Sequence, residues 1–373
     1  MNIDRIDLFH VAMPLREPWR TAASDETAIE SVLVRIMSGD LVGWGETAPH
    51  SGPNYCDEWA AGAFLVLERK LAPMIVGQDI STGKDLQRLL KPVKGNSFAK
   101  AGLDLAFYDL RARSTGTPLW QMLGGRNPDV LVGGDISVES TLEGLIEKIG
   151  AAVDSGLARV KLKFRPGWDV DMVAAVRSTF PDLVMHIDCN SAFTLDHVDM
   201  FRSLDRFHLA MIEQPLGHDD ILDHAVLRRK IGTPICLDET IVSVDRVRHA
   251  IMQQACDIIN LKLGRLGGIT PTLEVRQMCE DAGIGNWMGS MLESAVAQNA
   301  TLALATLPNM TYPADIFPTD RFYDEDLADR DVTFSSPSRM CASELPGIGV
   351  QPKPDMLDAF TVEKASVLPR DAG

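Results

Sequence analysis

Five charged side chains recur along the middle of the sequence at nearly equal intervals. Each ends a short apolar run that is typical of a β-strand, and the residues are Lys163, Asp188, Glu213, Asp238 and Lys262. Successive members are separated by 25, 25, 25 and 24 positions, which suits one strand, one helix and two loops. We therefore expect one βα unit between each charged residue and the next.

Such a spacing would bring the charged residues together. Equivalent positions on neighbouring parallel strands lie about 4.8 Å apart, so five of them would line one arc of a barrel mouth. Three carboxylates gathered there would repel one another unless a cation shared their charge. Oxygen ligands without cysteine or histidine favour Mg²⁺, with Mn²⁺ as a substitute. We predict Asp188, Glu213 and Asp238 as the metal ligands.

Two lysines flank the predicted metal site. With Lys163 on one side and Lys262 on the other, a lysine would reach each face of a carbon next to a carboxylate. Metal coordination of that carboxylate would stabilise an enediolate, so that a lysine can act as the base. Lys161 should share a strand face with Lys163 and lower its pKa. Access to both faces predicts racemisation, whereas a leaving group on the neighbouring carbon would give elimination.

Each charged residue taken alone has an ordinary explanation. An aspartate after a strand is more often a helix N-cap than a ligand, and a strand lysine is usually an exposed edge residue. Five charged strand ends at matched spacing are harder to explain in this way, so we interpret the set as functional. Asn190 fits a position behind the metal ligands and a plain loop equally well.

The elements that must position these residues follow from the pattern along the chain. Residues 3–12 and 31–38 resemble strands, Gly43-Trp44-Gly45-Glu46 has turn chemistry, and residues 56–124 have helical periodicity. After Gly125, β-rich runs alternate with amphipathic helices, which predicts a parallel sheet. The runs are 131–136, 159–164, 183–187, 209–212, 234–237, 257–261 and 284–288, each except the last with a plausible helix after it. A seventh unit, with or without an eighth, would close a barrel.

The composition excludes several classes of function. The 373 residues are 45% hydrophobic and 24% charged, which suits a large globular domain with a smaller companion. A net charge of −16 without a basic stripe argues against nucleic acid as a partner. The N-terminus lacks a signal-peptide layout and no apolar run could span a membrane, so we expect a cytoplasmic protein without a membrane partner. The six cysteines lack CxxC spacing and are interpreted as small buried residues.

The motifs resemble the muconate lactonizing enzyme subgroup of the enolase superfamily. They are Lys-x-Lys, Asp-x-Asn, Glu-Gln-Pro, Asp-Glu, Lys-x-Gly-Arg-x-Gly-Gly, Gly43-Trp44-Gly45-Glu46, Ala99-Lys100-Ala101 and a late Pro-Gly-Ile-Gly-Val. The resemblance implies an α/β fold, a (β/α)7β modified TIM barrel over 126–320. It also implies an α+β capping domain over 1–125, to which a loop-like segment 321–373 returns. Lys163 and Lys262 would be the acid/base pair.

Within the subgroup, residues 262–265, 289–293 and 320–323 resemble the N-succinylamino acid racemase and o-succinylbenzoate synthase branch. This implies Arg265 behind Lys262, with Asn190 and Glu239 supporting the metal ligands. Leu263, Ser290 and the segment 294–298 depart from the branch. Ser290 and residues 294–298 lie beside the expected substrate carboxylate. These departures therefore affect the prediction of the substrate more than the prediction of the reaction type.

The resemblance also implies a substrate pocket between the barrel mouth and two capping loops, about Arg16–Asp25 and Ser51–Trp59. The candidate substrate-binding residues are Trp19, Arg20, Tyr55, Ser137, Ser290, Met291, Glu293 and Phe317. The partner would be a small-molecule carboxylate. The leading hypothesis is racemisation or epimerisation of N-acyl amino acids, with o-succinylbenzoate synthase activity as an addition.

Other hypotheses remain open at this point. Cycloisomerisation or dipeptide epimerisation could use the same lysines and metal, although residues 287–293 lack the Asp-x-Asp motif that dipeptide epimerases usually carry. A catalytically silent barrel that serves as a binding protein would be expected to have lost one of the five charged residues. We also expect a homo-oligomer.

Overall fold

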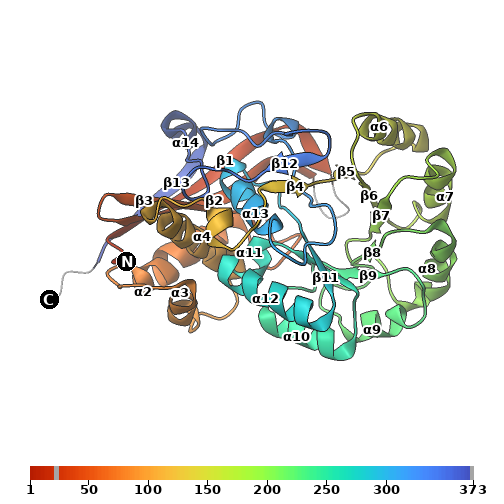
Figure 1. The fold of residues 1–373 in the computed structure, drawn as a ribbon, viewed down its shortest axis with the longest axis horizontal. Helices are drawn as coiled ribbons and strands as arrows, with labels where there is room; N and C mark the ends of the chain where they lie inside the picture. The colour runs from red at the N-terminus through yellow and green to blue at the C-terminus, as the bar shows by residue number, and fades with distance from the viewer. Residues whose placement is uncertain (21–24, 370–373) are drawn as a thin grey trace.

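The two ends of the chain form one antiparallel sheet in the order β13-β1-β2-β3. Its strands are β1 (Arg5–Arg20), β2 (Asp25–Ser38), β3 (Leu41–Thr47) and β13 (Thr361–Val367). Residues 1–20 and 25–369 are described by the computed structural model, in which this sheet extends from the left to the upper middle of Figure 1. Val367 pairs with Ile6, so the predicted return of the tail to the N-terminal domain is confirmed.

The segment Gly43-Trp44-Gly45-Glu46 lies inside β3, so the predicted turn is wrong. The two glycines instead allow helix α4 (Ser97–Ser114) to approach the strand closely. A Cβ atom on Gly43 would lie 2.2 Å from the carbonyl oxygen of Ala106, and one on Gly45 would lie 2.4 Å from that of Gly102. Glycine serves close packing here, which a sequence pattern does not distinguish from a turn.

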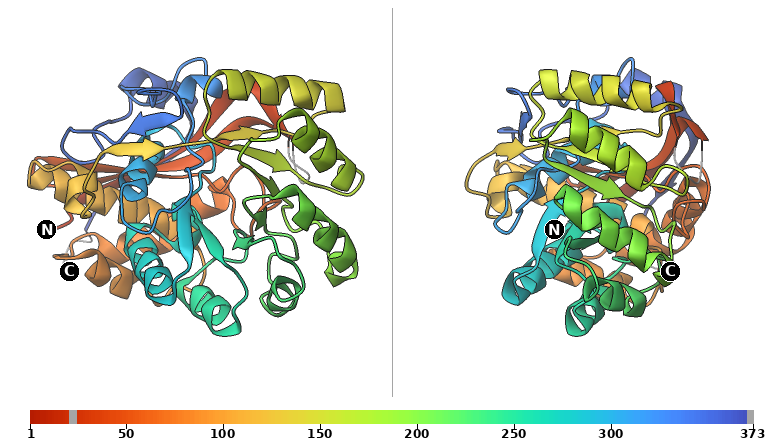
Figure 2. Two further views of the ribbon diagram at one scale, coloured as in Figure 1. Left: turned by 45° about the vertical axis from the view of Figure 1, so that its right-hand side comes forward. Right: turned by 90° about the vertical axis from the view of Figure 1, so that its right-hand side faces the viewer.

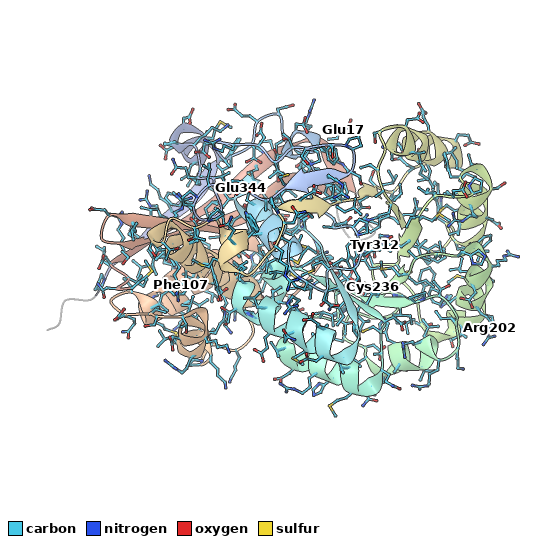
Figure 3. All side chains as sticks on the ribbon, in the orientation of Figure 1. Glu17, Phe107, Arg202, Cys236, Tyr312 and Glu344 are labelled. Carbon is cyan, nitrogen blue, oxygen red and sulfur yellow. The ribbon has the colours of Figure 1, made fainter. Side chains whose placement is uncertain are left out.

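Helices cover one side of this sheet, as the periodicity of residues 56–124 predicted. Beside α4 they are α1 (Ala60–Val66), η1 (Leu67–Leu71), α2 (Ala72–Ile75), α3 (Gly83–Leu90) and α5 (Leu119–Met122). Phe107 of α4 belongs to an apolar core that is separate from the larger core of the barrel. Figure 3 labels Phe107 in the capping region and Cys236 and Tyr312 in the barrel, where both belong to a third, small apolar cluster.

Seven parallel strands, each of which overlaps one of the seven predicted apolar runs, lie side by side in chain order. They are β5 (Gly134–Ile136), β6 (Val160–Lys163), β7 (Met185–Asp188), β8 (Ile212–Glu213), β9 (Ile235–Leu237), β10 (Ile258–Leu261) and β11 (Gly285–Met288). Figure 2 shows this sheet curving away from the antiparallel sheet.

Residues 310–315 close the ring without forming a regular strand. The backbone N–H of Thr311 donates to Asn286 of β11, and that of Ala314 donates to Leu131 just before β5. The predicted barrel therefore closes through an eighth segment that is too irregular for strand chemistry to have revealed it.

Helices surround the barrel in Figure 1. They are α6 (Leu142–Asp154), α7 (Val170–Thr179), η2 (Leu195–His197), α8 (Val198–Leu204), η3 (Asp205–Phe207), α9 (Leu222–Arg228), α10 (Val244–Gln253), α11 (Leu263–Leu266) and α12 (Ile269–Ala282). A helix also follows the last strand, α13 (Ala295–Ala305), where the sequence predicted none. Nearly all of α13 is buried against β3 and α5, so it has no polar face and its periodicity is weak.

The C-terminal segment contains more than the predicted loop. After η4 (Thr319–Arg321), strand β12 (Arg339–Cys341) pairs with β4 (Asp129–Leu131), and α14 (Pro354–Phe360) leads into β13. Cys341 is exposed, which contradicts the expectation that the cysteines are buried, and Cys56 is only half-buried. Among the described residues, no helix has both the length and the apolar character needed to cross a membrane. The domain boundaries proposed after residues 125 and 320 stay predictions.

Candidate active site

The five charged residues predicted from the spacing converge at the carboxyl ends of the barrel strands. Lys163, Asp188 and Glu213 end β6, β7 and β8 and lie opposite one another in register. Asp238 and Lys262 directly follow β9 and β10. None of the three carboxylates is more than 1% exposed. The predicted arc is therefore confirmed.

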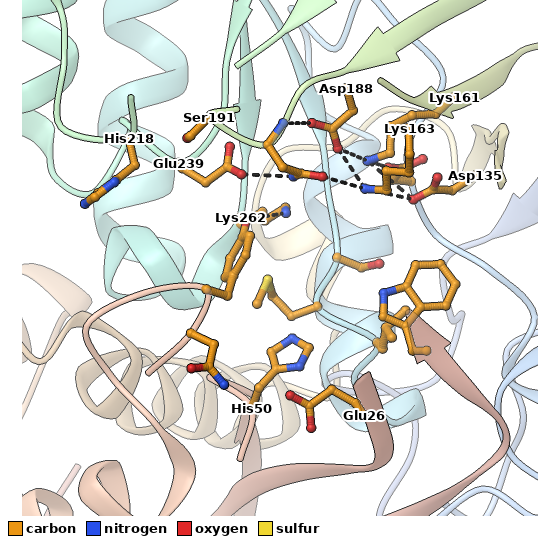
Figure 4. A pocket seen from close by; sticks show the side chains of 18 of the residues that line it. Glu26, His50, Asp135, Lys161, Lys163, Asp188, Ser191, His218, Glu239 and Lys262 are labelled. Carbon is orange, nitrogen blue, oxygen red and sulfur yellow. Dashed lines mark hydrogen bonds and ion pairs between the residues drawn. The ribbon is translucent and has the colours of Figure 1, made fainter. Parts of the chain in front are cut away.

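A cavity of about 190 Å³ opens between these strand ends and the capping sheet. Barrel residues on its wall include Lys161, Lys163, Asp188 and Lys262, which Figure 4 labels. The capping region contributes Trp19, Glu26, His50, Gly52, Asn54 and Tyr55. Both predicted capping segments therefore reach the cavity, although residues 21–24 lie outside the described part of the chain.

The Lys163 side of the cavity is built from barrel residues. The Lys163 ammonium donates to Asp188 Oδ2 at 2.9 Å and to Asn190 Oδ1 at 3.3 Å. The Lys161 ammonium lies 2.7 Å from Asp315 Oδ2 and 3.5 Å from Asp188 Oδ2. Positive and negative groups thus alternate along this wall.

The predicted lowering of the Lys163 pKa is wrong for this arrangement of charges. Burial lowers the pKa of Lys163, but Asp135 and Asp188 outweigh that effect and raise it above its ordinary value. Lys161 does lower the Lys163 pKa, as expected from their shared strand face, yet its effect is smaller. The prediction took account of the neighbouring cation in Lys-x-Lys but not of the carboxylates Asp135 and Asp188 on the two adjacent strands, which have the larger effect on the Lys163 pKa.

The Lys262 side joins the barrel to the capping domain. The Lys262 ammonium donates to Asp238 Oδ2 at 3.1 Å and to the Tyr55 hydroxyl at 2.9 Å. Arg265 donates to the same hydroxyl at 2.7 Å and also to Asp238 Oδ1. Burial raises the pKa of Asp238, but Arg265 and Lys262 outweigh it, so the pKa lies below its ordinary value. Arg265 therefore shares two hydrogen-bond partners with Lys262, and its predicted position behind that lysine stays a prediction.

The predicted metal ligands do not form a ready-made coordination site. Among the residues that the structure describes, no three Asp, Glu, His or Cys side chains are arranged to hold an ion as they stand. The Lys161 ammonium instead lies 3.5 Å from Asp188 Oδ2 and 3.7 Å from Glu213 Oε2. Lysines therefore supply the positive charge that these carboxylates require.

The chemistry of the donors nevertheless suits a hard divalent cation. Burial raises the pKa of Glu213 well above its ordinary value, and the charges of Asp188 and Asp238 add to this shift. Three carboxylates in one buried place offer oxygen ligands of the kind that Mg²⁺ takes. Such a cation would relieve their mutual repulsion.

Asn190 and Glu239 support this group of carboxylates. The side-chain amide of Asn190 donates to Glu239 Oε1 at 2.9 Å, and its backbone N–H donates to Asp188 Oδ1 at 3.0 Å. Burial raises the pKa of Glu239 to about 7, with Asp238 and Asp188 adding to the shift. Glu239 Oε2 is buried and has no hydrogen-bond partner in the described chain. This unused acceptor beside the carboxylates also fits a cation or a hydrated ion.

Among the described residues, only some of the predicted substrate-binding residues line the cavity. Those on the cavity wall are Trp19, Tyr55, Ser290, Met291 and Phe317. Glu293 lies behind the wall, where its carboxylate accepts from the backbone N–H of Met291 at 2.8 Å. Ser137 is not among the described lining residues, and its hydroxyl lies 3.4 Å from Glu139 Oε1. Arg20 ends β1, but its side chain lies outside the described structure.

Several polar groups of the cavity were not predicted from the sequence. Glu26, His50, Asp135 and Asp315 all line it. Burial and the Lys262 charge lower the pKa of His50 to about 4, so this imidazole is neutral near pH 7. Asp135 carried a readable signal, because it is a charged residue inside the apolar run 131–136, one unit before Lys163. Asp315 carried none, since the segment around it has no strand pattern.

Comparison with known families assigns the chain. Residues 4–124 match the mandelate racemase / muconate lactonizing enzyme N-terminal domain, and residues 144–356 match the enolase C-terminal domain-like family. The chain belongs to the enolase superfamily. The predicted resemblance is confirmed, as is the α/β barrel with a capping domain.

Individual relatives place the chain more finely. It is 38% identical over 365 residues to an N-succinylamino acid racemase of Amycolatopsis, which covers 98% of this chain and 99% of the relative. It is 39% identical over 305 residues to an o-succinylbenzoate synthase of Geobacillus stearothermophilus, which covers 82% and 81%. An enolase superfamily structure from Listeria innocua superposes with a TM-score of 0.95 at 32% identity, over 99% of both chains.

Proposed function

We propose that this protein racemises N-acyl amino acids, with N-succinyl amino acids as the first class to test. The reaction removes and returns the proton next to the carboxylate through an enediolate. The observation that carries the proposal is that Lys163 and Lys262 line one cavity from β6 and from the end of β10, with β7, β8 and β9 between them. Relatives named N-succinylamino acid racemase support the choice of substrate.

The two lysines would exchange one proton on opposite faces of the carbon. In one direction the free amine of Lys163 takes the proton, and the Lys262 ammonium returns a proton to the other face; the reverse direction exchanges the roles. Asp188 holds Lys163 at 2.9 Å, while Asp238 and Tyr55 hold Lys262 at 3.1 and 2.9 Å. These contacts fix each nitrogen at the cavity wall.

We further propose Asp188, Glu213 and Asp238 as ligands of Mg²⁺, with Asn190 and Glu239 supporting them. When bound, the ion supplies positive charge that stabilises charge developing on the substrate carboxylate and offsets the carboxylate beside Lys163. Members of the family are generally Mg²⁺-dependent.

Exchange of the α-proton with D₂O tests the acid/base assignment. Both enantiomers of several N-succinyl amino acids, together with dipeptides and betaines, are incubated with enzyme and followed by mass spectrometry. We expect Lys163→Ala to lose exchange with one enantiomer and Lys262→Ala with the other, each by roughly 10²- to 10⁴-fold, and neither to racemise. Lys148→Ala, at an exposed lysine, is the control. Racemisation by Lys163→Ala would refute the mechanism.

Thermal unfolding tests the metal assignment separately. A ligand that binds only the folded state raises its stability, so MgCl₂ should raise the melting temperature and EDTA should reverse the rise. Asp238→Asn should lose most of this response, because it removes one of the three proposed carboxylate ligands. An equal response in Asp238→Asn and in the unmodified protein would place the ion elsewhere.

A second candidate is the elimination that an o-succinylbenzoate synthase performs. The relative at 39% identity carries that name, and the same lysines and carboxylates would serve. Elimination needs only one lysine as the base, so one of the two lysine variants should retain it. Cycloisomerisation and dipeptide epimerisation are alternatives that the same exchange experiments distinguish.

A further inference from the structure

One carboxylate beside Lys163 has a role in neither the metal site nor the acid/base pair. Asp135, in the middle of β5, is 4% exposed and lines the cavity. Its Oδ2 lies 3.5 Å from the Lys161 nitrogen and 3.9 Å from the Lys163 nitrogen. Its Oδ1 is buried and has no hydrogen-bond partner among the residues described. Figure 4 shows the Asp135 carboxylate beside Lys163 on the cavity wall.

A buried carboxylate oxygen without a hydrogen-bond partner, such as Asp135 Oδ1, destabilises the folded protein. A buried polar group without a partner costs about 1–3 kcal/mol, and more when it is charged. The neighbouring Asp315 has no such deficit, because its Oδ2 lies 2.7 Å from the Lys161 nitrogen and its Oδ1 accepts from Arg159. Asp135 is therefore a carboxylate of this wall with an acceptor that the fold leaves unused.

The distance to Lys163 limits which part of a substrate meets Asp135. A base must come within about 3–3.5 Å of the carbon that it deprotonates. The atom bonded to that carbon lies about 1.5 Å farther on. A donor on this atom can therefore come within hydrogen-bond reach of the Asp135 carboxylate, whose Oδ2 is 3.9 Å from the Lys163 nitrogen.

We infer that Asp135 binds an N–H group attached to the reacting carbon. The substrate class is then an α-amino acid whose nitrogen keeps a hydrogen, either as a secondary amide or as an ammonium. This inference rests on the proposed function and deepens it. Asp135 would act as a specificity residue, since an analogue without the N–H leaves the buried oxygen unpaired in the complex as well.

A matched pair of substrates isolates this contact. N-succinylphenylalanine is compared with its ester analogue, in which oxygen replaces the N–H, and free phenylalanine is the third substrate. Rates of α-proton exchange with D₂O give an amide-to-ester preference for each protein. Because the two compounds differ in intrinsic acidity, the change in this preference on mutation is the quantity of interest.

We expect Asp135→Ala to reduce the amide-to-ester preference by tenfold or more. Asp135→Asn keeps an acceptor oxygen in the same place and should fall between Asp135→Ala and the unmodified protein. Asp315→Asn is the control, because it removes a negative charge beside Lys161 from a carboxylate whose two oxygens are already occupied. It should slow both substrates together and leave the preference within twofold.

The outcomes separate the two proposals. An unchanged preference in Asp135→Ala, with normal folding by circular dichroism, overturns the inference while the proposed function stands. If Asp135→Ala does not fold, an unchanged preference in Asp135→Asn overturns the inference. Absence of exchange with every N-acyl amino acid in the unmodified protein overturns the proposed function and the amide form of the inference together. Exchange of phenylalanine alone, lost in Asp135→Ala, supports the ammonium form.

Discussion

The two lysines of the cavity are held in different ways. Lys163 contacts Asp188 and Asn190, which lie on the next barrel unit, so the barrel alone fixes it. Lys262 contacts Asp238 of the barrel and Tyr55 of the capping region, so it needs both parts of the molecule. The acid/base chemistry that we propose for the two faces of one carbon would thus rest on unequal structural support. The same kind of mutation should therefore have different effects on the two sides.

The largest difference is expected in stability. Asp238 is the one described carboxylate within 4 Å of Lys262 and of Arg265, and all three residues are buried. Asp238→Ala therefore leaves two buried cations without a carboxylate partner, which should cost about 3–5 kcal/mol. Urea unfolding in the presence of EDTA measures this loss without a contribution from bound metal.

Asp188→Ala is the matched variant on the Lys163 side of the cavity. Lys161 keeps Asp315 at 2.7 Å, and Lys163 keeps Asp135 at 3.9 Å. The loss of stability should therefore be less than half of that in Asp238→Ala. Equal losses would show that the two sides have the same electrostatic support.

The next largest effect is expected on the exchange rate when the Tyr55 hydroxyl, which joins the capping region to Lys262, is removed. Tyr55→Phe removes an acceptor from both Lys262 and Arg265 and a donor to Asp238. Hydrogen bonds to charged groups contribute about 1.5–3 kcal/mol, so exchange of the enantiomer that uses Lys262 should slow by roughly 10- to 100-fold. Exchange through Lys163 should change little, which measurement of both enantiomers decides.

Tyr312→Phe is the control for Tyr55→Phe. The Tyr312 hydroxyl bonds to His186 inside the barrel at 3.0 Å, and Tyr312 does not line the cavity among the described residues. This variant should leave the ratio of the two enantiomer rates unchanged. A shift in that ratio would mean that barrel packing in general, and not the Tyr55 contact, sets the balance.

A smaller, pH-dependent effect is expected in the loop beside Lys262. Burial raises the pKa of Glu293 to about 7, and the Glu46 charge adds to the shift. Because the folded pKa lies above the unfolded value, the contribution of Glu293 to stability is lost as the pH rises from about 4.5 to 7. Glu293→Gln should remove this loss and gain on the order of 1–3 kcal/mol between pH 5 and 8. Urea unfolding of Glu293→Gln and of the unmodified protein at pH 5 and at pH 8 measures this gain. An equal change of the unfolding free energy with pH in the two proteins would contradict the prediction.

The smallest effect is expected at a residue outside the cavity. Ser137 was a candidate for substrate binding, but its hydroxyl lies near Glu139 and not on the described wall. Ser137→Ala should change kcat/KM by no more than about twofold, the size of an ordinary surface substitution. A change of tenfold or more would return Ser137 to the binding site.

The strand periodicity and the five charged strand ends were readable from the sequence because they are local features with a regular spacing. Other features depended on neighbours that are distant in the chain. Gly43 and Gly45 resembled a turn until α4 was seen to pack against them, and α13 lost its helical period because it is buried almost all round. Closure by residues 310–315 involves irregular backbone, for which the sequence has no pattern.

The sequence by itself determined the order of the βα units and which three carboxylates and two lysines gather at the strand ends. Only the tertiary structure decided how strongly each lysine is held and what faces it. Those properties depend on carboxylates and a phenol that come from other strands and from the capping region, as Asp135 does for Lys163 and Tyr55 does for Lys262. Electrostatic effects depend on distance through space, and a single sequence encodes that distance only through the completed fold.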